Sequence, residues 1–346
     1  TLKNTGVFVQ DTWAINYNLS LMFGVRVDMP DFSSQRLYNP RIEQLYGFDN
    51  TKLVDKGLVQ PRVGFNYTFD SERPTQLRGG VGLFGGAAPN AWLAGAYQNT
   101  GLNYVEYDQR NPPVGSFTPD GNNPYIPAGG PASARQNVDI IAPGTRLPSV
   151  WKANLAFDHE LPWYGIVASA ELLLTKVKDG IYFDRLDVGT QTAVGPDGRA
   201  IYWNPQGRNP ANTRGDLGMT TGTNGAVDRA NRPSDMGDVL VLRNTDKGRG
   251  SQATFSLAKP LTENWGWSLG YTYTQAKEVS PLSSSQNTSN WNNTLIFNAN
   301  ENVDYNSRYA IKERLTGTLE RKHNFFGDND TRVCLFHDGC SGRPDS

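Results

Sequence analysis

The stretch Leu19-Ser20-Leu21-Met22-Phe23-Gly24-Val25-Arg26-Val27-Asp28 alternates between apolar and polar residues. Its odd-numbered positions are leucine, phenylalanine or valine, whereas Ser20, Gly24, Arg26 and Asp28 fall on even-numbered positions. Successive side chains of a β-strand point to opposite faces, so the pattern predicts a strand with one apolar and one polar face. The first face suits lipid and the second suits water.

The same alternation recurs in five pairs of segments, and a short turn joins the two segments of each pair. The pairs are 5–14 with 19–28, 59–69 with 75–85, 150–160 with 165–178, 248–259 with 265–276, and 308–322 with 330–340. Four long polar loops separate the pairs, among them 29–57, 86–148 and 179–247. Short turns at one end and long loops at the other are typical of outer-membrane barrels. The sequence therefore predicts an all-β fold, an antiparallel transmembrane β-barrel present as an incomplete portion of about ten strands with long extracellular loops.

The composition argues against several other classes of protein. Only 37% of the 346 residues are hydrophobic, and no run approaches the ~18 consecutive apolar residues of a membrane helix. In a barrel this is expected, because lipid-facing and lumen-facing residues alternate. The net charge of −1 and the scattered Lys and Arg residues provide no basic surface for nucleic acid.

The two cysteines, Cys334 and Cys340, fall on one predicted strand. Extended, they would lie roughly 20 Å apart, whereas a disulfide needs Cα atoms about 5.5–6 Å apart. With only His337 nearby they also fall short of a four-ligand metal site. We therefore expect neither a disulfide between them nor a bound metal.

Aromatic residues recur beside all five short turns. They are Trp13, Tyr17, Phe69, Trp163, Tyr164, Trp265, Phe325 and Phe326. Rings held at one depth are what a membrane-interface girdle requires. The alternative is that these rings simply cap a soluble sheet.

Two motifs that could indicate chemistry are better explained by the sheet. Gly80–Gly85 matches the dinucleotide-binding fingerprint, but its strand alternates in polarity and no further βαβ units follow. His159, His323 and His337 show neither triad order nor metalloprotease spacing. We expect no enzyme activity and no cofactor.

Several motifs in order resemble the barrel of TonB-dependent outer-membrane receptors, with the Oar-like branch as the best match. They are Gly6–Trp13, Gly24-Val25-Arg26, Gln60–Phe65, Asn244–Gly248, Tyr271–Tyr273, Ser289–Trp291 and Ser341–Pro344. The resemblance implies a barrel of 22 strands in the family, filled by an N-terminal plug that engages TonB. Residues 1–346 are then expected to be part of such a barrel without the plug and the terminal strands, truncated at both ends.

Three arginines on the predicted polar face are the candidate site residues. Arg26, Arg62 and Arg78 would face the lumen, where the resemblance implies contact with the substrate path or the plug. The alternative is that they are solvated or paired with carboxylates such as Asp28.

The resemblance implies a receptor in the bacterial outer membrane that binds a ligand on its extracellular loops and imports it with energy supplied by TonB. The expected partners are outer-membrane lipid, TonB through the plug, and an extracellular ligand that the sequence does not identify; nucleic acid is not among them. Two alternatives stay open: a surface adhesion or secretion role on the same scaffold, and a soluble all-β carbohydrate-binding protein.

Overall fold

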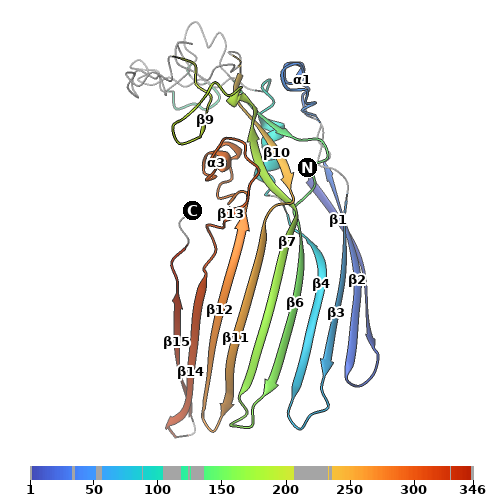
Figure 1. Cartoon of the computed structure of the whole chain (residues 1–346), viewed down its shortest axis with the longest axis vertical. Coiled ribbons are helices and arrows are strands. Elements are labelled where there is room, and N and C mark those ends of the chain that lie inside the picture. Colours follow the sequence, from blue (N-terminus) through green and yellow to red (C-terminus); the bar gives the residue numbers. More distant parts are fainter. Residues whose placement is uncertain are drawn as a thin grey trace.

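Ten long strands form one antiparallel sheet in which spatial order follows chain order (Figure 1). The computed structural model describes residues 2–32, 36–51, 57–87, 89–103, 118–123, 125, 136–205, 233, 236–327 and 329–343. The ten strands are β1 (Leu2–Ala14), β2 (Leu19–Phe32), β3 (Leu58–Thr68), β4 (Thr75–Gly85), β6 (Ser149–Glu160), β7 (Val167–Arg185), β11 (Arg249–Thr262), β12 (Trp265–Glu278), β14 (Glu313–Phe326) and β15 (Asn329–Cys340). This confirms the predicted strand pairs, although β14 begins at Glu313 rather than near residue 308.

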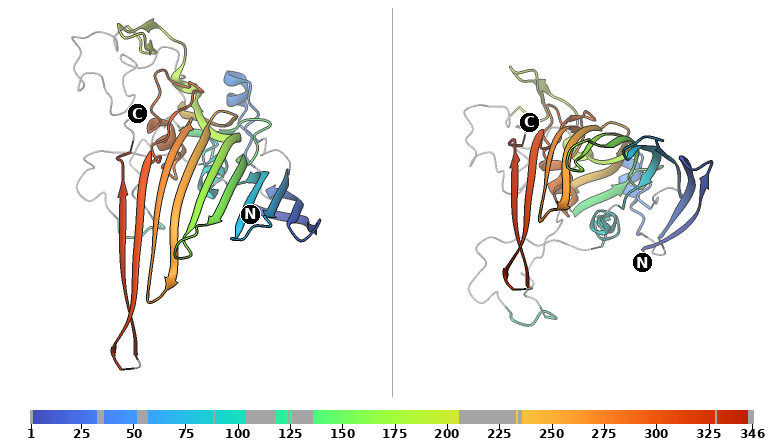
Figure 2. Two further views of the ribbon diagram at one scale, coloured as in Figure 1. Left: turned by 60° about the horizontal axis from the view of Figure 1, so that its bottom comes forward. Right: turned by 90° about the horizontal axis from the view of Figure 1, so that it is seen from below.

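The sheet curves like part of a barrel wall, with α2 (Asn90–Gln98) on its concave side (Figure 2). Within the described residues the sheet does not close, because β1 and β15 lie at its two ends. None of the helices in these residues is long and apolar enough to cross a membrane.

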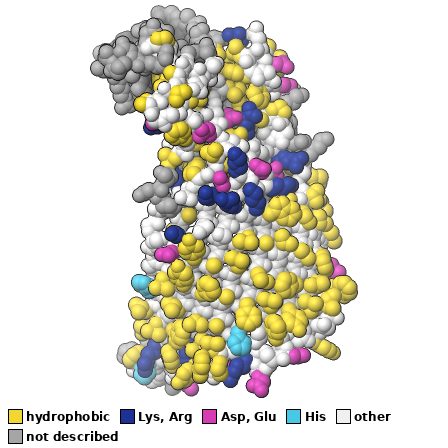
Figure 3. Space-filling view, in the orientation of Figure 1, with side chains coloured by type: hydrophobic (Ala, Val, Ile, Leu, Met, Phe, Trp, Pro, Cys, Tyr) yellow, Lys and Arg dark blue, Asp and Glu magenta, His cyan; other side chains and the backbone are white. Residues whose placement is uncertain are grey.

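The strand register separates two faces across the whole sheet. Arg26 lies opposite Gln60 on the neighbouring strand. Arg62 lies opposite Gly82, which in turn lies opposite Lys152, so polar and small residues line the inner, concave face. The alternate positions place large apolar residues on the outer face, where Phe23, Leu172 and Phe255 are exposed. Figure 3 shows this apolar surface over the lower part of the sheet. The predicted separation of an apolar face from a polar face is thereby confirmed.

The described parts of the long loops are folded. They form α1 (Pro40–Tyr46), α2, β5 (Gln136–Ile141), η1 (Leu186–Val188), β8 (Ala193–Val194), β9 (Ala200–Ile201), β10 (Met236–Thr245), α3 (Asn287–Asn292) and β13 (Tyr305–Asn306). β10 pairs in parallel with β5 and antiparallel with the upper end of β7. We call α1, α2, β5, β10 and α3 the loop layer. The predicted polar loop 86–148 thus contains a helix at 90–98 and a strand at 136–141, while much of that loop lies outside the described residues.

The main buried apolar clusters lie in the loop layer rather than in the membrane-spanning wall. On the inner side, Trp92 and Leu93 of α2 pack against Ile181, Phe183 and Leu242. On the other side the buried residues are Ile42, Val138, Ile140, Ala142, Met236, Val239 and Val241. Isolated loops of this length could not bury so much apolar surface. The paired strands β5 and β10 therefore serve as a common support for helices from separate loops.

Local sequence explains where the first of these helices begins and ends. The side chain of Asn39 accepts a hydrogen bond from the Arg41 N–H (3.0 Å), and Pro40 occupies the first helical turn, where its missing N–H costs nothing. Gly47 ends the helix in a left-handed conformation with φ of 71°. Asn39 also donates to the Thr100 carbonyl (2.8 Å), which joins α1 to the segment that follows α2.

Candidate functional site

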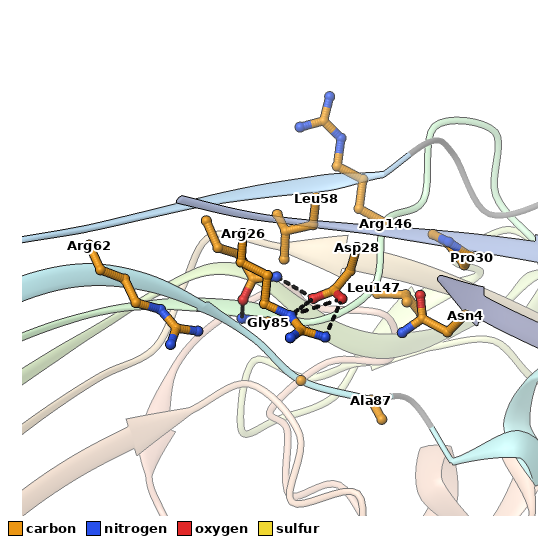
Figure 4. A pocket seen from close by; sticks show the side chains of 12 residues that line it. Asn4, Arg26, Asp28, Pro30, Leu58, Arg62, Gly85, Ala87, Arg146 and Leu147 are labelled. Carbon is orange, nitrogen blue, oxygen red and sulfur yellow. Dashed lines mark hydrogen bonds and ion pairs between the residues drawn. The ribbon is translucent and has the colours of Figure 1, made fainter. Parts of the chain in front are cut away.

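A cavity of about 370 Å³ opens on the inner face where the upper ends of β2, β3 and β4 meet the loop layer (Figure 4). It is lined by Asn4, Arg26, Asp28, Pro30, Leu58, Gln60, Arg62, Gly85, Gly86, Ala87, Arg146 and Leu147. We call it the inner-wall cavity. It lies at the end of the sheet that carries the long loops, which in an outer-membrane barrel is the extracellular end.

An ion pair forms one side of this cavity. Arg26 and Asp28 are two residues apart on β2 and therefore share a face. Arg26 donates from Nε (2.9 Å) and Nη2 (2.7 Å) to the two oxygens of Asp28. The Gln60 amide also donates to Asp28, while its oxygen accepts from the Gly85 N–H (2.8 Å). Arg26 is thus paired with the carboxylate named in the alternative interpretation, and Gln60 fixes that carboxylate between two strands.

Gly6 on β1 leaves room for this pair. A Cβ at Gly6 would lie 2.6 Å from Oδ1 of Asp28 and would collide with Nη2 of Arg26. The glycine stands at the start of the Gly6–Trp13 motif, but the sequence does not show which side chains fill the space beside it. In the register of β1 and β2, Gly6 lies directly opposite Asp28.

Arg62 lines the cavity and forms no ion pair in direct contact with a carboxylate of the described residues, although the charge of Asp28 is near enough to act on it. Its Cζ lies 4.5 Å from the centre of the Phe84 ring, and Nζ of Lys152 lies 6.0 Å from the same ring. Cation–π contacts of this kind stabilise a charge without neutralising it. Arg62 therefore remains able to pair with an anionic group.

Arg78 lies apart from the other two candidates. Its Nε is 3.2 Å from Asp158 and its Nη2 is 3.9 Å from Glu171, two carboxylates on β6 and β7. It does not line the inner-wall cavity. The structure thus brings Arg26 and Arg62 together and leaves Arg78 in a separate cluster further down the wall.

Arg146 is a cavity residue that the sequence did not reveal. It follows β5, and its backbone is held by Asn244 of β10, which accepts from the Arg146 N–H (2.6 Å) and donates to its carbonyl (3.0 Å). Figure 4 shows the guanidinium of Arg146 pointing away from the Arg26–Asp28 pair. The pairing of Gly85 with Ser149 and the bond from the Gly86 N–H to the Pro148 carbonyl also bring this segment to the top of β4, but residue 146 lies in a polar loop that no alternation marks.

The charge of the lining favours an anionic partner. Arg26, Arg62 and Arg146 contribute three positive charges, and Asp28 contributes the single negative charge. Arginines in a partly enclosed polar cavity recognise carboxylate, phosphate or similar oxyanions.

The remaining motifs lie within the sheet. Gly80–Gly85 belongs to β4, with antiparallel partners on both sides, and a Cβ at Gly80 would lie 2.8 Å from the Val63 carbonyl oxygen. His159, His323 and His337 lie on three different strands. In the described part of the chain, no three His, Cys, Asp or Glu side chains are placed to hold a metal ion. Cys334 and Cys340 are free, exposed thiols.

The turn aromatics are exposed at the end of the sheet opposite the loop layer. Trp13 and Trp163 are each 61% exposed, and Tyr17 and Phe325 also project outward. The side chain of Phe326 lies outside the described residues. This arrangement fits the predicted interface girdle.

A buried ion pair ties the loop layer together. Arg185 donates from Nε to Asp187 (3.0 Å) and also pairs with Asp238, while Asp187 accepts from the Val239 N–H (2.8 Å). Asp187 is completely buried and Arg185 nearly so. Arg185 also lies over the Trp291 ring at 5.2 Å, which links α3 to β7.

Asp139 of β5 is a second buried charge in the layer. It accepts from Nδ2 of Asn99 (2.7 Å), beside α2, and the amide of Asn287 in α3 also faces it. Burial raises the pKa of Asp139 to about 6, and the two amides act in the opposite direction. This carboxyl therefore connects β5 and the end of α2, which belong to one loop, with α3 from another.

The match to a protein family agrees with this architecture. Residues 1–330 match the family described as the outer membrane beta barrel domain. No curated protein matches the sequence significantly. Similar solved structures include a mutant ferric enterobactin receptor from Pseudomonas aeruginosa, with 12% identity and a TM-score of 0.49 over 99% of this chain and 33% of that chain. The alcaligin outer membrane receptor from Bordetella pertussis gives 11% identity and a TM-score of 0.42 over 99% of this chain and 38% of that chain.

The chain spans about a third of the length of these structures. The family match covers nearly all of it, and the strand register provides an apolar outer wall and a polar inner one. The protein is therefore located in the bacterial outer membrane, and the chain belongs to the outer membrane beta-barrel domain family.

Proposed function

We propose that this chain forms part of the barrel of a TonB-dependent receptor, which binds a ligand on its extracellular side, imports it with energy from TonB and catalyses no reaction. The observation that carries the proposal is the inner-wall cavity, which has a net positive lining and lies directly beside the folded loop layer. A barrel that served only as a membrane anchor would need neither a folded layer at its mouth nor uncompensated arginines on its inner wall. The ordered motifs that resemble this receptor family support the same conclusion.

The charge of the cavity defines the class of ligand. Arg62 and Arg146 have no carboxylate partner in the described residues, so an anionic group that passes the loop layer would find two available guanidinium groups. We propose an anionic metal chelate as the cargo. The same arginines would otherwise contact carboxylates of the plug.

The test measures uptake by living cells that carry the full-length protein. The probe is radiolabelled iron supplied as ferric enterobactin, an anionic chelate, to matched cells with and without TonB. We expect uptake that depends on TonB. Uptake of equal size in both cells, or adhesion of the cells to a surface without any uptake, would overturn the proposal.

Two variants connect uptake to the cavity. Replacing Arg62 and Arg146 together by Gln removes the two uncompensated charges and should weaken binding of the chelate by roughly tenfold for each charge. The matched control is Arg78→Gln, since Arg78 faces the same lumen but lies between Asp158 and Glu171. Equal losses in the two variants would contradict a role for this cavity.

A further inference from the structure

Three cationic side chains stand in a row across the outer face of the sheet. The register places Arg249 of β11 opposite Lys176 of β7 on one side and opposite Lys277 of β12 on the other. All three side chains are exposed. Lys312, directly before β14, lies close to this row: its carbonyl accepts from the Thr274 N–H, and its Nζ lies 5.9 Å from the centre of the Tyr273 ring. We call these four residues the cationic row.

The row is electrostatically unfavourable by itself. Side chains directly opposite each other on neighbouring strands are about 5 Å apart at Cβ, and like charges there destabilise the pair. Within the described part of the chain, Lys176, Arg249 and Lys277 form no ion pair with a carboxylate. An anionic group outside these residues would relieve this repulsion, and the face on which they stand is the apolar, lipid-facing one.

The depth of the row matches the outer rim of the membrane. On β12 the row begins at Lys277, and the exposed ring of Trp265 marks the other end of the strand. Twelve residues at ~3.3 Å each, tilted by ~40°, cross about 30 Å, which is the thickness of the hydrocarbon layer. Figure 3 shows Lys and Arg side chains gathered directly above the apolar surface. The cationic row therefore lies where lipid headgroups of the outer leaflet would be.

Two grooves on the same strands fit the two parts of a lipid. The upper groove, about 700 Å³, is lined by all four members of the cationic row together with Asn306. The lower groove, about 440 Å³, has an almost wholly apolar lining that includes Ala170, Phe255, Leu269 and Leu315. The small side chains of Ala168 and Ala170 between larger neighbours make the wall concave there.

We propose that the cationic row binds the phosphate groups of an outer-leaflet glycolipid whose acyl chains lie along the apolar groove below. Phosphate oxygens would accept hydrogen bonds from Arg249, Lys176 and Lys277 and remove their mutual repulsion. This site is on the outside of the wall, so it does not depend on the import proposed above.

The test uses the full-length protein extracted from outer membranes in detergent, and it measures bound lipid by native mass spectrometry. The probes are lipid A with two phosphates, the same lipid with both phosphates removed, and inorganic phosphate. We expect the bisphosphorylated lipid to remain bound and the dephosphorylated lipid to bind far more weakly. Equal binding of the two lipids would overturn the proposal, as would inorganic phosphate displacing the lipid at millimolar concentration.

The variant that tests the row carries Arg249→Gln and Lys277→Gln. Loss of two cations near the headgroups should weaken lipid binding roughly 30-fold. The matched control carries Arg199→Gln and Arg321→Gln, two exposed cations outside the row. Should the double variant fold poorly, Lys277→Gln alone should still weaken lipid binding several-fold. Variant and control with the same affinity would contradict the assignment.

Discussion

At the scale of single residues, the charges divide into three kinds by their surroundings. Arg185 and Asp187 are buried and paired, Arg26 and Asp28 are paired beside a cavity, and Arg62 is held against a ring without a carboxylate. The first kind serves the fold, because a buried charge without its partner is very costly. The last kind remains available for a ligand.

The buried pair leads to the first prediction. Asp187→Asn removes one of the two negative charges that pair with Arg185 and should destabilise the loop layer by about 3 kcal/mol. The measurement is hydrogen exchange of the β10 amides, which should become faster. The control is Asp197→Asn, which removes the partner of Arg199 in an exposed pair with the same two-residue spacing and should leave exchange unchanged. Equal acceleration in both variants would show that burial does not decide the effect.

At the scale of elements, sequence periodicity identified the strands but not the loop layer. The alternation along Leu19–Asp28 identifies both the strand and its lipid-facing side, because the polarity of each residue indicates the face on which it lies. The packing of Trp92 against Phe183 and the pairing of β5 with β10 join residues from separate loops, and no local spacing encodes them. For the same reason Arg26 and Arg62 could be chosen as candidates, whereas Arg146 could not.

Asp139 gives the element-scale prediction, since it joins β5 to residues beside α2 and in α3. Its pKa rises from 3.8 in the unfolded chain to about 6 in the folded layer because of burial. Between these values the folded state binds more protons, so the contribution of this carboxyl to stability is fully present below about pH 4 and is lost as the pH rises through about 6. The shift corresponds to about 3 kcal/mol.

Hydrogen exchange of residues 90–98 at pH 5 and pH 7, corrected for intrinsic rates, would measure this effect. Protection of α2 should be greater at pH 5. Asp139→Asn, which mimics the neutral acid, should remove the difference. If the pH effect persists unchanged in that variant, another group is responsible.

At the scale of the whole molecule, the two faces of the wall should respond in opposite ways to a new charge. Phe255 is 57% exposed on the outer face near the middle of β11, and the preceding residue, Thr254, lies on the inner face opposite Glu171. Phe255→Arg should destabilise the barrel by about 2–4 kcal/mol because the charge enters hydrocarbon. Thr254→Arg should cost little, because water and Glu171 are available to it.

Folding of the full-length protein into phospholipid vesicles, followed in urea, would measure both variants. Similar losses for Phe255→Arg and Thr254→Arg would mean that the outer face does not contact lipid. A loss confined to Thr254→Arg would mean that the two faces had been assigned the wrong way round.

One feature of the wall would set the shape of the entrance in the import proposed above. β7 continues without a break for 19 residues, and its upper end, Gly180–Arg185, carries β10 while its lower part pairs with β6 and β11. The part of β7 that carries β10 is thus a continuation of a wall strand, with one bulge in its pairing with β6 between Val177 and Asp179. A molecule imported as proposed above would pass beside this extension of β7, so the place of β10 would form one side of the entrance and would limit the width of the molecules that enter.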